Sequence, residues 1–158
     1  TTVCHTILFS YLWLIICNKT AGLFRQANAK IKLKGIMTNS EIQKTQIEAI
    51  AEAMLEKKAN NVVAMDLTSI GTAITDHFVI CNADSTTQVS AICDNVTDRV
   101  YEKCGIDPIR SQGKENAFWI ILDYGDIVVH IFKSEYRDFY RLEDLWSDDA
   151  KMVFTDSE

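Results

Sequence analysis

The sequence predicts a single α/β domain, in which a mixed β-sheet carries helices packed mainly on one of its faces. Two patterns support this fold class. Short runs rich in Val and Ile alternate with longer segments in which apolar residues recur every three or four positions, as in amphipathic helices. The last two apolar runs are separated only by a short turn, which predicts an antiparallel hairpin. With 158 residues, 47% of them hydrophobic, the chain is long enough to bury one core.

The first predicted helix ends near Lys58. Two capping boxes could open it, either Thr38 with Glu41 or Thr45 with Glu48, because a hydroxyl and a carboxylate three residues apart can satisfy each other's backbone N–H groups. The apolar residues that fall at helical spacing are Ile47, Ile50, Ala51, Met54 and Leu55.

Three short strands are predicted before the hairpin. Residues 62–67 and 77–82 are apolar runs of strand length, and residues 68–76 between them form a polar loop. Residues 109–110 are expected to make a short edge strand.

Two more helices have recognisable ends. Ser85 and Gln88 predict a capping box that opens the second helix, and Gly105 ends it. Ser134 is expected to cap the last helix. The second helix carries Val89, Ile92, Cys93, Val96 and Val100 on one face, and the last carries Tyr136, Phe139 and Tyr140 on one face.

The hairpin joins residues 118–122 to residues 127–132. We place Tyr124 and Gly125 at the centre of its turn, because Gly125 can adopt the positive φ that a two-residue turn requires. Antiparallel pairing then follows from the turn. The predicted pairs are Asp123 with Asp126, Leu122 with Ile127, Ile121 with Val128, Ile120 with Val129, Trp119 with His130 and Phe118 with Ile131.

The two faces of the hairpin differ in chemistry, since side chains alternate along a strand. One face is apolar and is expected to face the core: Phe118, Ile120, Leu122, Ile127, Val129 and Ile131. The other, called here the mixed face, carries Trp119, Ile121, Asp123, Asp126, Val128 and His130. The mixed face is interpreted either as a solvated surface partly covered by the following helix or as an interaction surface. A metal or acid–base cluster of Asp123, Asp126 and His130 is a weaker third interpretation, because the two carboxylates flank a turn and no second ligand pair has metal-binding spacing.

Charge is unevenly distributed along the chain. Residues 1–36 contain five basic side chains and no acidic one, whereas residues 37–158 contain 11 basic and 22 acidic side chains, a formal charge of −11. We interpret residues 1–36 as an N-terminal extension that is non-native or disordered, residues 37–148 as the domain, and residues 149–158 as a solvated acidic tail. So negative a domain is expected not to bind nucleic acid directly.

Neither a membrane anchor nor a disulfide framework is expected. The apolar run over residues 7–17 is shorter than the ~20 residues that span a bilayer. The five cysteines are odd in number and form no Cys-x-x-Cys pair, which favours reduced thiols in a cytosol-like compartment.

Several segments, taken together and in order, resemble the Iojap family, also called the ribosomal silencing factor (RsfS) family. The hairpin and the Tyr-Arg-x-Phe-Tyr-x-Leu-Glu-x-Leu-Trp segment occur at the family's spacing. Two residues depart from it: Gln112, where the family usually has Glu, and His77, where an apolar or aromatic residue is usual. The segments that carry the resemblance are residues 75–81, 84–89, Pro108 with Gly113, 119–132 and 135–146.

The resemblance implies a fold related to nucleotidyltransferases and a translation repressor that is not an enzyme and needs no cofactor or metal. It implies binding to the large ribosomal subunit at ribosomal protein uL14, which would prevent docking of the small subunit. A bacterial cytoplasm is the expected compartment, with an organelle as the alternative. The candidate partner-binding residues are Trp119, Ile121 and Tyr124 as apolar anchors, Asp123, Asp126 and Glu143 toward basic groups, and His130, Arg137 and Tyr140 to complete or brace the patch. Further aromatic and leucine side chains of the last helix are candidates for the core: Tyr136, Phe139, Leu142, Leu145 and Trp146.

Two alternatives remain open. One is a homodimer that pairs its mixed face with itself. The other is a degenerate nucleotidyltransferase-like enzyme that uses Asp123, Asp126 and His130, although the sequence lacks the Gly-Ser helix entry with closely spaced carboxylates that would hold two magnesium ions.

Overall fold

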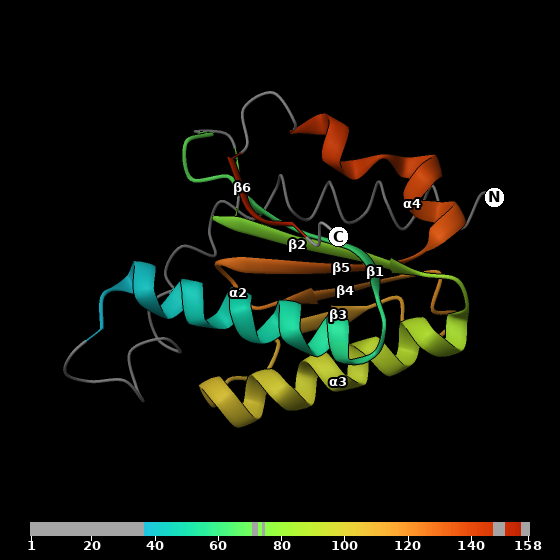
Figure 1. Ribbon diagram of the computed structural model, residues 1–158, viewed down its shortest axis with the longest axis horizontal. Helices are drawn as coiled ribbons and strands as arrows, with labels where there is room; N and C mark the ends of the chain where they lie inside the picture. The colour runs from blue at the N-terminus through green and yellow to red at the C-terminus, as the bar shows by residue number, and fades with distance from the viewer. Residues whose placement is uncertain (1–36, 71–72, 74, 147–150, 156–158) are drawn as a thin grey trace. The chain divides into compact units, whose positions relative to one another are not determined.

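A six-stranded mixed sheet in the order β3-β4-β5-β2-β1-β6 forms the centre of the fold (Figure 1). The computed structural model describes residues 37–70, 73 and 75–146, and the backbone of 151–155. β2 and β5 run parallel, and the other neighbouring strands run antiparallel, so the predicted mixed sheet is confirmed. The strands are β1 (Asn60–Asp66), β2 (His77–Ala83), β3 (Arg110–Gln112), β4 (Trp119–Asp123), β5 (Ile127–Lys133) and β6 (Lys151–Thr155).

Two long helices, α2 (Asn39–Glu56) and α3 (Thr86–Cys104), cover one face of the sheet (Figure 1). Their apolar sides pack with the inward-facing residues of the strands into one buried cluster. Burial of this apolar area is the main term that stabilises the domain. The strand residues in the cluster include five of the six residues on the predicted core face of the hairpin: Ile120, Leu122, Ile127, Val129 and Ile131. The prediction was wrong for the sixth, Phe118, which precedes β4 and stacks its ring on that of Tyr136 at 4.9 Å.

Side-chain caps mark where α2 and α3 begin. Thr38 Oγ1 accepts from the backbone N of Glu41 at 3.3 Å, and Glu41 Oε2 accepts from the backbone N of Thr38 at 2.7 Å, so the first of the two possible boxes forms. Ser85 Oγ accepts from the backbone N of Gln88, but the Gln88 amide donates to the carbonyls of Lys57 and Lys58 rather than back to Ser85. Gln88 therefore ties the start of α3 to the end of α2.

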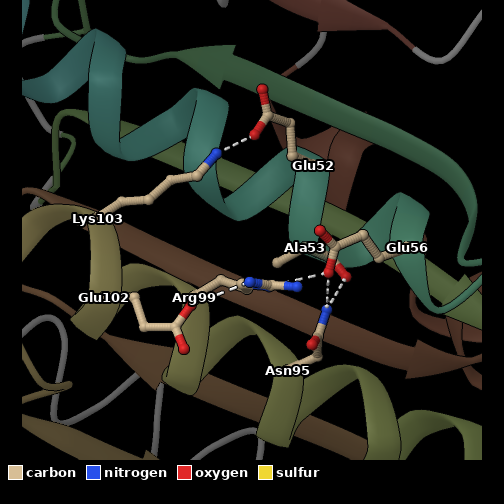
Figure 2. A network of polar contacts seen from close by, with 7 residues as sticks. All are labelled: Glu52, Ala53, Glu56, Asn95, Arg99, Glu102 and Lys103. Atoms are coloured by element: carbon tan, nitrogen blue, oxygen red, sulfur yellow. Dashed lines mark hydrogen bonds and ion pairs between the residues drawn. The ribbon is translucent and has the colours of Figure 1, made fainter.

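On the solvent side, polar contacts join α2 to α3 (Figure 2). Arg99 donates to Glu56 at 3.1 Å and to Glu102 at 3.0 Å, and Lys103 pairs with Glu52. Asn95 donates to the Ala53 carbonyl at 2.8 Å. Because most of these side chains are exposed, water and salt screen the contacts, and they contribute more to the alignment of the helices than to stability.

The short helix α4 (Ser134–Tyr140) and the 3₁₀ turn η2 (Leu142–Leu145) lie on the opposite face (Figure 1). The Tyr140 ring lies 5.4 Å from the Trp119 ring, and the Trp146 ring lies 6.4 Å from that of Phe78. Within the described residues, no helix is both long and apolar enough to cross a membrane.

The hairpin register differs from the predicted one by two residues. The backbone N of Tyr124 donates to the Ile127 carbonyl at 2.9 Å, which puts Gly125, with a φ of 92°, and Asp126 at the centre of the turn. Because side chains alternate with a period of two, this shift leaves each strand residue on its predicted face. The observed pairs are Trp119 with Phe132, Ile120 with Ile131, Ile121 with His130, Leu122 with Val129 and Asp123 with Val128.

Two further expectations differ from the structure. Ser134 makes no capping hydrogen bond to α4, which begins after Lys133 without a side-chain cap. Residues 151–155, expected to lie in a solvated tail, form β6 and pair with β1, because the edge of β1 offers free backbone groups to an extended segment. The proposed extension, residues 1–36, lies outside the described residues.

Candidate partner-binding surface

The mixed face has Trp119 of β4 and His130 of β5 at its centre. Trp119 Nε1 donates to His130 Nδ1 at 3.2 Å, and the Trp119 ring stacks on that of Phe132 at 4.8 Å. Burial lowers the pKa of His130 to about 3, so the ring is neutral near pH 7. Since Nδ1 accepts, the proton sits on Nε2, which has no hydrogen-bond partner among the described residues.

Both rings are inside the molecule. Trp119 is 7% exposed and His130 2%, and Ile121, which pairs with His130 across the hairpin, is also buried. A ring with so little exposed area cannot contact a partner directly in this conformation. These three residues therefore form a layer beneath α4 that determines the shape of the surface above it.

Tyr124 lies on the other side of the sheet. Its ring packs against the cluster that α2 and α3 form, next to Cys104, and burial raises the pKa of its phenol. The three residues expected to act as apolar anchors are thus not brought together: Trp119 and Ile121 lie on the α4 side and Tyr124 on the α3 side.

Asp123 and Asp126 organise the hairpin turn. Asp123 Oδ1 accepts from the backbone N of Gly125 at 2.8 Å. The Asp126 carbonyl accepts from the backbone N of Asp76 and of His77, at 3.0 Å each, and thereby connects the turn to the start of β2. In the part of the chain that the structure describes, no three His, Cys, Asp or Glu side chains are placed to hold a metal ion.

Arg137 and Glu143 contact each other. Arg137 Nε donates to Glu143 Oε1 at 2.8 Å, and a second guanidinium nitrogen contacts the same oxygen. The third nitrogen of Arg137 donates to the sheet. These two residues, predicted to meet a partner, meet each other in the structure.

The outer surface of α4 and η2 exposes two apolar side chains. Phe139 is 71% exposed and Leu145 64%, whereas Leu142 is buried. Tyr140 is half-buried, between Trp119 and Phe139. Phe139 and Leu145 were candidates for the core, but the structure exposes both. α4 ends at Tyr140, where Arg141 turns to a φ of 46°, so helical periodicity does not extend to Leu145 in η2.

Comparison with known proteins gives one consistent result. The model of the family described as "Ribosomal silencing factor during starvation" (RsfS) matches residues 39–158. A Bacillus subtilis protein named ribosomal silencing factor RsfS is 37% identical over 106 residues, which cover 67% of this chain and 88% of that protein. A crystal structure of a Chromobacterium violaceum protein superposes with a TM-score of 0.59 at 30% identity and covers 70% of this chain and 88% of that one.

A more distant match comes from an organelle. The mouse protein named mitochondrial assembly of ribosomal large subunit protein 1 is 36% identical over 76 residues, 46% of this chain and 33% of that protein. The family model spans every strand and helix described above. The chain belongs to the RsfS family of ribosomal silencing factors.

Proposed function

We propose that this protein represses translation by binding the large ribosomal subunit at ribosomal protein uL14, where it blocks docking of the small subunit. The observation that carries the proposal is the family match over residues 39–158, which includes the hairpin, α4 and η2. Repression by occupation of a surface needs no catalysis and no cofactor. We place this activity in a bacterial cytoplasm.

The charge of the domain favours a protein partner over ribosomal RNA. Residues 37–158 carry a formal charge of −11. Phosphates repel such a surface within the Debye length of ~8 Å at physiological salt, whereas a basic ribosomal protein attracts it. The electrostatic field would therefore steer the domain toward a basic protein patch.

The α4–η2 surface is a part of the proposed site that a partner can reach directly. Phe139 and Leu145 are both exposed, and large apolar side chains exposed on a surface can mark interaction sites. Tyr140 lies beside Phe139 and above Trp119. We propose that Tyr140 and its exposed neighbours contact uL14, while buried Trp119, Ile121 and His130 support them from below. The remaining candidates act through the turn and the tether to the sheet: Asp123, Tyr124, Asp126, Arg137 and Glu143.

The test is co-sedimentation of the full chain with purified large subunits. Phe139→Ser removes an exposed ring from the proposed surface, and Tyr101→Ser removes a comparably exposed ring from α3 on the opposite face. We expect Phe139→Ser to weaken binding at least tenfold, about 1.4 kcal/mol, and Tyr101→Ser to leave it unchanged. Trp119→Ala should also weaken binding, by removing the support beneath Tyr140.

Four outcomes would contradict the proposal in different ways. If the wild-type chain does not sediment with large subunits, the silencing function is wrong. If Tyr101→Ser weakens binding as much as Phe139→Ser, the surface is wrongly placed. A mass that rises with concentration, with no subunit binding, would instead favour the homodimer, and metal-dependent nucleotide turnover lost in Asp123→Asn would favour the enzyme.

A further inference from the structure

Arg137 is an arginine at the centre of a buried polar network beneath α4. It is only 9% exposed. One terminal nitrogen, Nη1, donates to the Asn61 carbonyl of β1 at 2.6 Å and to Asn82 Oδ1 of β2 at 2.9 Å. Nε and the other terminal nitrogen face Glu143 of η2. A single side chain thus joins four elements: α4, η2, β1 and β2.

The start of α4 is attached to the same strand. Asn82 Nδ2 donates to Ser134 Oγ at 2.8 Å, and Ser134 Oγ lies within 3.1 Å of the Ala83 carbonyl and 2.9 Å of Asp84 Oδ1. Asn82 Oδ1 also accepts from Asn61 Nδ2 at 3.2 Å. Ser134 and Arg137 therefore fix the first turn of α4 to β2 through one shared asparagine.

The α4–η2 segment needs such external fixation. α4 has seven residues and no side-chain cap at either end, and so short a helix is not stable by itself in water. Arg141, with a φ of 46°, separates it from η2. The geometry of the segment consequently depends on its contacts with the sheet, which include the Arg137 network.

We propose that Arg137 is a positioning residue for partner binding, and this inference rests on the proposed function. Its guanidinium does not contact the partner, since its donors are occupied within the fold. It holds α4 and η2 in the arrangement that exposes Phe139 and Leu145. Lysine cannot replace it, because one ammonium group cannot serve Glu143 and the two strands at once in the fixed fork geometry of arginine.

The experiment compares Arg137→Lys with Arg99→Lys in the full chain. Arg99 also contacts two acceptors, Glu56 and Glu102, but on the surface between α2 and α3 (Figure 2). We expect Arg137→Lys to weaken co-sedimentation with large subunits about tenfold or more and to speed hydrogen exchange at the amides of residues 134–146, while Arg99→Lys changes neither.

A double mutant separates positioning from general destabilisation. If Arg137 acts through Phe139, Arg137→Lys should cause little further loss of binding in a Phe139→Ser background, because the contact that it positions is already gone. If the fold-loss of affinity in the double mutant equals the product of the two single-mutant losses, the inference is wrong. Wild-type binding and exchange in Arg137→Lys would also overturn it.

Glu143→Gln provides a second, milder variant in case Arg137→Lys does not fold. Gln keeps an acceptor for Arg137 and leaves the contacts to Asn61 and Asn82 in place, so a loss in the same direction but smaller is expected. Failure of the wild-type chain to bind large subunits would refute the proposed function. The exchange measurement would then still decide whether Arg137 holds the α4–η2 segment.

Discussion

At the scale of single residues, burial of His130 makes stability depend on pH. Its pKa is lowered to about 3 in the folded protein, whereas a histidine in the unfolded chain titrates near 6.5. Between these two pKa values the unfolded state binds a proton that the folded state does not. The contribution of neutral His130 to the free energy of unfolding is therefore complete above pH 6.5 and is lost as the pH falls from 6.5 toward 3. At pH 5 the loss is about 2 kcal/mol.

Urea unfolding at pH 7.5 and pH 5 measures this effect against a matched variant. His130→Gln has no titrating group, and its side-chain oxygen can still accept from Trp119 Nε1. The wild type should lose about 2 kcal/mol more than His130→Gln between the two pH values. Equal losses of stability in the two proteins would mean that His130 can be protonated while the protein stays folded.

Some features of single residues could be predicted from the sequence, such as helix caps, and others could not, such as the contacts of Arg137. The caps at Thr38, Ser85 and Gly105 depend on neighbours within four residues, so sequence patterns predicted them. Arg137 depends on Asn61 and Asn82, which lie 76 and 55 positions away. No local pattern encodes those distances, so the sequence suggested only that Arg137 completes or braces the surface patch and did not identify the groups that it contacts.

At the scale of elements, two glycines that both have positive φ should differ in importance. Gly113, at the end of β3, has a φ of 81°, and a Cβ there would lie 1.9 Å from the Trp119 carbonyl oxygen of β4. Gly125 in the hairpin turn has a φ of 92°, but the nearest atom to its added Cβ is Ile109 Cδ1 at 3.4 Å. Gly113→Ala must move backbone, whereas Gly125→Ala mainly strains φ.

We therefore expect Gly113→Ala to reduce the free energy of unfolding by about 3 kcal/mol or more, and Gly125→Ala by about 1–2 kcal/mol. Thermal unfolding followed by circular dichroism would measure both. If the two variants lose the same free energy of unfolding, β3 does not approach β4 as closely at Gly113 as the structure shows.

Strand faces could be predicted from the sequence, but strand partners could not. Alternation assigned the residues of β4 and β5 to their faces, and a two-residue shift of register leaves those faces unchanged, so the pattern could not distinguish the two turns. β6 was missed for a related reason. Its segment lies among acidic residues, and only the free edge of β1, which the sequence does not display, makes it a strand.

At the scale of the whole molecule, fold and candidate site differ in how far the sequence determines them. The sheet and the α2–α3 layer follow from hydrophobic periodicity, because the apolar sides of the strands and of the two helices are buried against each other. The binding surface depends on which residues α4 leaves exposed. That depends on where a short helix docks, and here it exposes Phe139 and buries Trp119.

The proposed mechanism predicts stoichiometric inhibition of subunit association. A protein that blocks docking by occupying space can block only the large subunit to which it is bound. If light scattering follows subunit association at a large-subunit concentration well above the Kd, titration with the wild-type chain should lower the signal linearly up to about one molecule per large subunit. Phe139→Ser should need a larger excess, and Tyr101→Ser should behave as the wild type.

The titration curve should change slope at a certain ratio of protein to large subunit, and this ratio distinguishes the three functions considered. A ratio near one supports a monomer that acts by exclusion. A ratio near two would mean that the protein docks as a dimer, so the α4–η2 surface of one copy would face the other copy rather than the ribosome. Complete inhibition by a small fraction of one molecule per subunit would require turnover, which exclusion cannot supply and only the enzyme alternative could explain.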